Sequence, residues 1–172
     1  MRNLLLPTAM AGLLAGLPVF MNALTLNGNR WTARSVDGAY IVSIEDRASI
    51  LVALTDFITS QRIHAGQLTG IGATNQATLR FFDPASKQYV DKTFNEQMEI
   101  SNLAGNISEA DGKLLLHLHI TLGRKDYTAL AGHLLDANVR GAAEFFVYPI
   151  NSRVVKVHDD DVGLYFYDFA HH

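Results

Sequence analysis

The sequence contains no cysteine, and it has no excess of positive charge. Its 172 residues include 14 Lys and Arg against 17 Asp and Glu, which gives a formal net charge of -3. The absence of cysteine excludes disulfides, zinc–thiolate sites and thiol nucleophiles. The charge balance excludes the strongly basic composition typical of nucleic-acid-binding domains. Hydrophobic residues nevertheless make up 48% of the chain, so we expect one domain with a packed core and exclude a disordered chain.

Long hydrophobic runs are also scarce, and only the beginning of the chain holds one. Residues 1–23 start with a basic residue, continue with an uncharged stretch rich in Leu, Ala and Gly, and end with Ala23. This order is typical of a secretory signal, although Met21 is larger than the residue usually found at that position before a cleavage site.

The same stretch does not predict a membrane anchor. Two prolines interrupt it and disfavour a stable spanning helix, and no later run reaches the roughly 18 apolar residues that a span requires. We therefore expect a signal peptide or a disordered arm over residues 1–23 and a single domain over residues 24–172. The protein is then expected to be exported to the periplasm if the signal functions, and to be cytoplasmic otherwise.

Hydrophobic periodicity predicts one helix and a set of short strands. Residues 24–38 are polar and suggest a loose lead-in, whereas residues 39–44 are β-branched and aromatic, as in a strand. Apolar residues at helical spacing from Ile50 to Ile58 predict a helix that Asp46 caps and that ends near Arg62. After this helix, hydrophobic residues recur mostly at every second position, as in strands, which favours an α+β domain with a largely antiparallel sheet. The further predicted strands are 68–71, 77–82, 89–94, 98–103, 106–108, 114–122, a segment around His133, 144–150, 154–157 and 164–169.

The strand predicted over residues 114–122 carries two histidines on one face. Its even-numbered Leu and Ile residues share the core face, so His117 and His119 project together from the other face, about 6.6 Å apart at the backbone. Ring nitrogens at this spacing can converge on one metal ion at about 2.0–2.1 Å each. His133 offers a third nitrogen, because a short loop returns its strand antiparallel to the first. Three neutral imidazoles without thiolates suit Zn²⁺ and, less selectively, Ni²⁺, Co²⁺ or Fe²⁺.

A three-histidine site leaves one coordination position open for water or a substrate oxygen. The alternative is a group of histidines hydrogen-bonded to neighbours on a half-exposed sheet face. Arg80 and Glu99 lie on the polar sides of their strands and are candidate catalytic residues, Arg80 as substrate anchor and Glu99 as general base. For these two the alternative is a surface ion pair. Asn106 is a further candidate donor to this region, and His64 is expected in a loop.

Five sequence blocks follow one another along residues 39–169. They are Gly70–Ala73, Thr78–Pro84, Glu99–Ser108, Leu116–Leu122 and Gly132–Leu135. Together they resemble the PPC (plants and prokaryotes conserved) domain family. The resemblance implies a compact α+β fold that assembles as a homotrimer. It also implies that the three histidines of the family pattern are His117, His119 and His133.

The resemblance leaves several functions open. The family is often labelled DNA-binding because plant members carry a separate AT-hook with an Arg-Gly-Arg-Pro core, which this sequence lacks. Direct DNA binding would therefore rest on the label alone. The fold also resembles those of α-acetolactate decarboxylase and a zinc-dependent ester hydrolase. The candidate functions are a homotrimeric metal-binding protein with an unidentified small-molecule ligand, a DNA- or protein-associated regulatory module, and a metal-dependent hydrolase or decarboxylase acting on a small carboxylate or ester.

Overall fold

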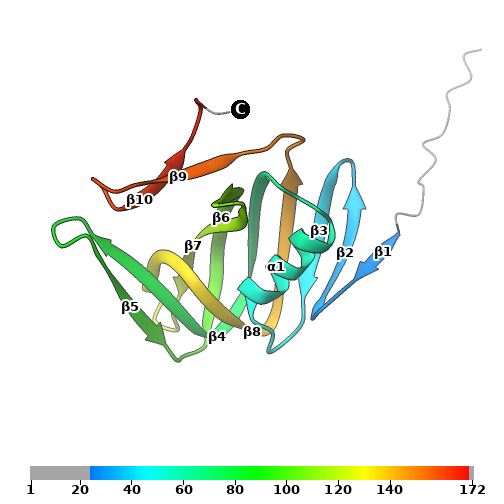
Figure 1. Ribbon diagram of the computed structural model, residues 1–172. Helices are drawn as coiled ribbons and strands as arrows, with labels where there is room; N and C mark the ends of the chain where they lie inside the picture. Colours follow the sequence, from blue (N-terminus) through cyan, green and yellow to red (C-terminus); the bar gives the residue numbers. More distant parts are fainter. Residues whose placement is uncertain (1–23, 171–172) are drawn as a thin grey trace, which may run out of the picture.

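The computed structural model describes residues 24–170, so the segment expected to be a signal lies outside the described residues. One helix and ten strands build the described part of the chain (Figure 1). This confirms the predicted α+β class with a largely antiparallel sheet. The elements are β1 (Thr25–Asn27), β2 (Trp31–Val36), β3 (Ala39–Ile44), α1 (Ile50–Ser60), β4 (Gly66–Asp83), β5 (Gln88–Phe94), β6 (Met98–Ala110), β7 (Lys113–Gly123), β8 (Ala129–Pro149), β9 (Val155–Asp159) and β10 (Leu164–Tyr167).

The sheet curls into a closed circuit of four strands. Its order is β1-β2-β3-β8-β4-β6-β9-β10, while β5 pairs with β4 and β7 pairs with both β6 and β8. Because β4 also lies between β8 and β6, the strands β4, β6, β7 and β8 pair in a ring. Among the described strands, β9 makes the one parallel pairing, with β6. The helix α1 lies in front of the sheet (Figure 1).

Several short strands predicted from the sequence merge into long ones. β4 has 18 residues and β8 has 21, so each replaces two predicted strands. Polar residues inside these strands do not end them. Thr74 is fully buried, yet its hydroxyl donates to the backbone oxygen of Asn138 at 2.6 Å. The register shift between Gly70 and Gly72 bends β4 without interrupting its pairing, since a bulge adds a residue to one strand only.

The predicted lead-in is wrong, because residues 24–38 contain β1 and β2. Trp31 and Ala33 alternate with exposed neighbours and are 2% and 3% exposed. The indole nitrogen of Trp31 donates to Asp56 on α1 at 2.6 Å, and its ring meets Phe57 edge-on with centroids 5.0 Å apart. The polar composition of this segment concealed the alternation that places β2 in the core.

The predicted helix is present, but its cap is not Asp46. The Ser49 side chain accepts a hydrogen bond from the Val52 amide at 3.1 Å, and the helix spans Ile50–Ser60. Asp46 instead accepts from the backbone nitrogen of Gly141 at 2.8 Å. Its carboxylate therefore ties the loop before α1 to β8, which holds the buried face of the helix against the sheet.

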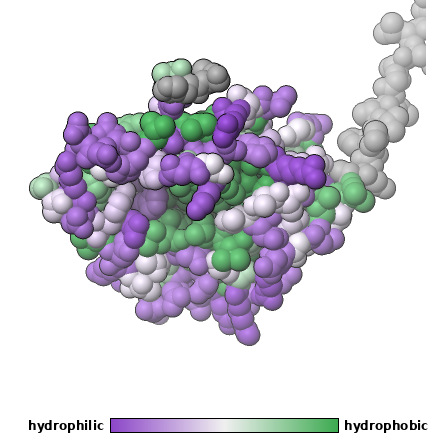
Figure 2. Space-filling view, in the orientation of Figure 1, coloured by the Kyte–Doolittle hydropathy of each residue, from purple (hydrophilic) through white to green (hydrophobic). Residues whose placement is uncertain are grey.

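The hairpin of β9 and β10 crosses one end of the sheet (Figure 1). Val157 and Phe166 face each other across this hairpin, and each is 47% exposed. Figure 2 shows hydrophobic residues on the surface where the hairpin lies.

Among the described residues, no helix has both the length and the apolar character needed to cross a membrane.

Candidate metal centre

β7 and β8 bring three histidines together. His119 pairs directly with His133 across the β7–β8 ladder, and His117 projects from the same face of β7. The ring centroids are 5.2 Å apart for His117 and His119, 5.0 Å for His117 and His133, and 5.5 Å for His119 and His133. One nitrogen from each ring lies within 4.8 Å of the others. The clustering expected from the alternation of β7 is confirmed.

The donor set fits a transition metal. Nitrogens bound to a tetrahedral ion at about 2.0–2.1 Å are about 3.3 Å apart, so small ring rotations would bring these three into range. Burial, with smaller contributions from His117, His119 and Arg80 and an opposing one from Asp91, lowers the pKa of His133 to about 4. Burial, Lys156 and His119 likewise lower the pKa of His117. The rings of His117 and His133 are therefore neutral near pH 7 and offer lone pairs to a metal ion.

A glycine permits the strand packing behind the cluster. Gly105 on β6 pairs with Leu118 between the two histidines of β7. A side chain at this position would collide with the backbone oxygen of His117. Gly105 thus lets β6 approach β7 closely enough to keep the ladder regular beneath His117 and His119.

Arg80 borders the cluster as expected, but another residue engages its side chain. It lies directly opposite His133 in the β4–β8 ladder. Its guanidinium donates two hydrogen bonds to Asp91, at 2.7 Å and 2.8 Å, and lies 4.6 Å above the Tyr89 ring. Since a bidentate carboxylate partner compensates the positive charge, Arg80 is not a free anchor for an anionic substrate.

Glu99 does not lie with the histidines, which corrects its expected role as their general base. It pairs with Gly123 at the far ends of β6 and β7, five positions before Ala104, the partner of His119. At about 3.3 Å per residue, this separation is about 16 Å along the strand. Glu99 instead lines a separate cavity of about 540 Å³. Strand alternation predicted its polar face correctly, but it carries no information on distance along the strand.

Lys156 lies close to the cluster, and the sequence pattern did not single it out. It belongs to β9 and is 4% exposed. Its amine donates to the side-chain oxygen of Asn106 at 2.8 Å, and Asn106 lies directly opposite His117 in the β6–β7 ladder. The amine also lies 4.7 Å from the centre of the Tyr167 ring. Asn106, a candidate from the sequence, thus connects Lys156 to the histidine face.

A cavity of about 510 Å³ opens beside the cluster. Its lining includes residues of β6 and β7 and Tyr167 of β10. The residues that line it are Gly66, Gln67, Ala104, Gly105, Asn106, His117, His119, Ile150 and Tyr167. The hairpin of β9 and β10 therefore supplies an aromatic wall to the space in front of the imidazoles.

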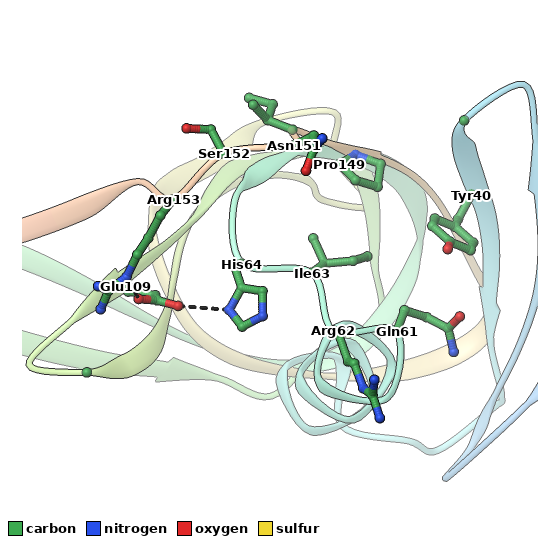
Figure 3. Close-up of a pocket in the computed structure, with 13 residues that line it drawn as sticks. Tyr40, Gln61, Arg62, Ile63, His64, Glu109, Pro149, Asn151, Ser152 and Arg153 are labelled. Atoms are coloured by element: carbon green, nitrogen blue, oxygen red, sulfur yellow. Dashed lines mark hydrogen bonds and ion pairs between the residues drawn. The ribbon is translucent and has the colours of Figure 1, made fainter. Parts of the chain in front are cut away.

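A cavity of about 850 Å³ lies beyond the end of α1 (Figure 3). In it Glu109 accepts hydrogen bonds from Arg153 at 2.6 Å and from the His64 ring at 2.8 Å. These bonds, the one from Arg153 foremost, lower the pKa of the Glu109 carboxyl. His64 therefore lies with Glu109 and not with the other three histidines.

These features define the class of protein: an α+β domain with a curled, largely antiparallel sheet that carries a cluster of three histidines. Residues 32–151 match the Plants and Prokaryotes Conserved (PCC) domain, and the chain belongs to this family. The resemblance to the PPC domain family in the sequence is thereby confirmed. A search of curated proteins finds no match.

Solved structures of similar fold agree with this assignment. A Bacteroides thetaiotaomicron protein, provisionally named as DNA-binding, is 50% identical, with a TM-score of 0.80 over 82% of this chain and 99% of its own. A metal-containing protein from Archaeoglobus fulgidus is 30% identical, with a TM-score of 0.72 over 77% and 94% of the two chains. A plant- and prokaryote-conserved protein from Pyrococcus horikoshii shares the fold at 20% identity, with a TM-score of 0.70 over 83% and 97%.

Proposed function

We propose that this protein binds one divalent transition metal, preferentially Zn²⁺, through His117, His119 and His133, and that the metal presents its open position to a small-molecule ligand. The observation that carries the proposal is the convergence of three imidazole rings from two paired strands. Neutral nitrogen donors without thiolates or carboxylates suit Zn²⁺ and neighbouring transition metals better than Mg²⁺ or Ca²⁺.

Two further observations support a metal here. The low pKa of His133 means that metal binding at neutral pH displaces no proton from this ring. A similar protein of 30% identity from Archaeoglobus fulgidus is metal-containing. When bound, the metal would supply Lewis acidity towards an oxygen of the ligand.

Metal analysis of protein without a polyhistidine tag tests the proposal. After equilibration with Zn²⁺ and gel filtration, wild type should retain about one metal ion per chain, whereas His119→Ala should retain little. His158→Ala is the matched control, because His158 pairs with Asp160 in the turn after β9. Wild type without retained metal, together with unchanged thermal stability in His119→Ala, would exclude the site.

We also propose that the chain assembles as a homotrimer. An apolar patch on the outer sheet face supports self-association: Ile41 faces Phe146 across β3 and β8, and Tyr148 stacks beside Phe146 at 6.3 Å. These side chains are 42–47% exposed. Light scattering should give three times the mass of one chain, and Phe146→Asp should lower it. Val52→Asp, on the exposed face of α1, is the control.

A DNA-associated role is the second candidate, supported by the provisional name of the Bacteroides protein. The net charge of -3 opposes it, because phosphate contacts supply most nonspecific affinity. A gel shift that weakens as salt rises would support DNA binding. Export of the chain, for which residues 1–23 are the proposed signal, would separate it from DNA.

The third candidate is metal-assisted hydrolysis or decarboxylation. It requires an acid or base beside the open metal position, but Glu99 lies at the far end of β6, and Asp91, the carboxylate that acts on His133, is engaged by two hydrogen bonds from Arg80. The geometry therefore favours metal and ligand binding over this chemistry.

A further inference from the structure

Lys156 is a buried cation without a carboxylate partner. Its side chain belongs to a residue that is 4% exposed, and none of the ion pairs among the described residues includes it. An ammonium group taken out of water is unfavourable unless an opposite charge or several hydrogen bonds replace the water. An ammonium group has three N–H donors, and a hydrogen bond to Asn106 accounts for one of them.

The other basic side chains near a cavity differ from Lys156. Arg80, next to the histidines, donates two hydrogen bonds to Asp91. Arg153, in the cavity beyond the end of α1, pairs with Glu109. Arg62 lines that same cavity but is exposed, so water screens its charge. Lys156 alone among these four combines burial with the absence of a described carboxylate partner.

The Lys156 amine lies directly behind the lining of the cavity beside the histidines, in contact with two residues that line it. Asn106, which holds the Lys156 amine, lines this cavity together with His117 and His119. Tyr167, whose ring centre lies 4.7 Å from the amine, also lines this cavity. A metal held by the three imidazoles would add a second positive charge to the same space.

We propose that the cavity beside His117 and His119 binds a small oxyanion, a carboxylate or a phosphate, whose negative charge Lys156 compensates. The inference rests on the proposed metal site for the second charge that attracts the anion. It names the ligand class of that site, whereas the family assignment to residues 32–151 does not include Lys156. Charge-assisted hydrogen bonds from the ammonium group would select an anion over a neutral ligand of equal size.

The test uses the full chain loaded with Co²⁺, whose visible absorption reports changes in coordination. Acetate and inorganic phosphate are titrated separately. At least one of them should change the spectrum of wild type in a saturable way, and the anion with the lower Kd identifies a carboxylate or a phosphate ligand. Lys156→Met should still bind Co²⁺ and should weaken that anion by about tenfold or more, the range expected for a hydrogen bond to a charged group.

The control is Lys113→Met, which makes the same charge change at an exposed lysine at the start of β7. It should bind the anion as wild type does. A merely structural role for Lys156 predicts the opposite pattern, in which thermal stability falls and anion affinity stays unchanged. That pattern, or a wild-type spectrum insensitive to both anions, would overturn the proposal.

Failure of the proposed metal site can be distinguished from failure of the proposed oxyanion site. If the protein takes up no Co²⁺, the proposed metal function fails. The oxyanion site is then judged by calorimetry on the metal-free protein. Binding of either anion that Lys156→Met weakens would sustain it, and no binding of either would overturn it as well.

Discussion

The low pKa of His133 predicts that protonation of this ring contributes to the loss of stability of the metal-free protein in mild acid. Its pKa falls from an ordinary 6.5 to about 4, mainly because burial disfavours the charged form. The unfolded chain therefore takes up a proton that the folded chain refuses as pH falls from about 6.5 towards 4. Stability from this ring is complete above that window and is lost on acidification, since the unfolded state binds more protons.

The size of the stability loss follows from the ordinary His pKa of 6.5 in the unfolded chain and the pKa of about 4 in the folded chain. Between pH 7.5 and pH 5.0, proton linkage gives a loss of about 2 kcal/mol for a fully shielded ring. Because His133 is only partly buried, screening by solvent reduces the expected loss to about 1–2 kcal/mol. Urea unfolding of metal-free wild type and His133→Gln at both pH values measures it.

The variant should lose less stability on acidification than wild type by this amount, because Gln does not titrate. Acid-titrating groups remote from the histidine cluster contribute equally to both proteins and cancel in the comparison. Equal losses in wild type and His133→Gln would refute the assigned burial of the His133 ring.

Three further outcomes follow from the described contacts. Zn²⁺ at 100 times its Kd should stabilise wild type by about 2.7 kcal/mol, measured as a rise in Tm that His119→Ala abolishes. Phe57→Ala should cost about 3–5 kcal/mol in urea unfolding, because the ring is fully buried between Trp31 and Tyr40. Gly105→Ala should weaken both thermal stability and Zn²⁺ affinity, because its methyl group pushes β6 away from His117; unchanged affinity would show that β6 does not support the cluster.

The histidine cluster was predictable because it depends on strand periodicity. Alternation placed His117 and His119 on one face, and a short connection returned His133 beside them. The position of Glu99 was not predictable in the same way. Periodicity assigns a residue to a face, whereas distance from the cluster depends on the register between β6 and β7.

Lys156 escaped prediction for a related reason. A lysine within a run of valines suggests a solvent-facing position, and its burial arises only because β9 pairs with β6 and β10 covers it. Likewise, β2 was missed because its two core residues, Trp31 and Ala33, are separated by polar ones. For Lys156 and for β2, burial depends on contacts between segments distant in the sequence, and local composition does not predict such contacts.

The closed circuit of β4, β6, β7 and β8 has a consequence for how tightly an ion is held. His133 lies where β8 pairs with β7 on one side and with β4 on the other, facing His119 and Arg80. His119 and His133 each lie in two backbone ladders, and His117 lies in the β6–β7 ladder, so displacement of a strand away from the cluster would break backbone pairing. The cluster is thus a preorganised chelate, in which capture of an ion costs little conformational entropy and its release must proceed by ring rotation.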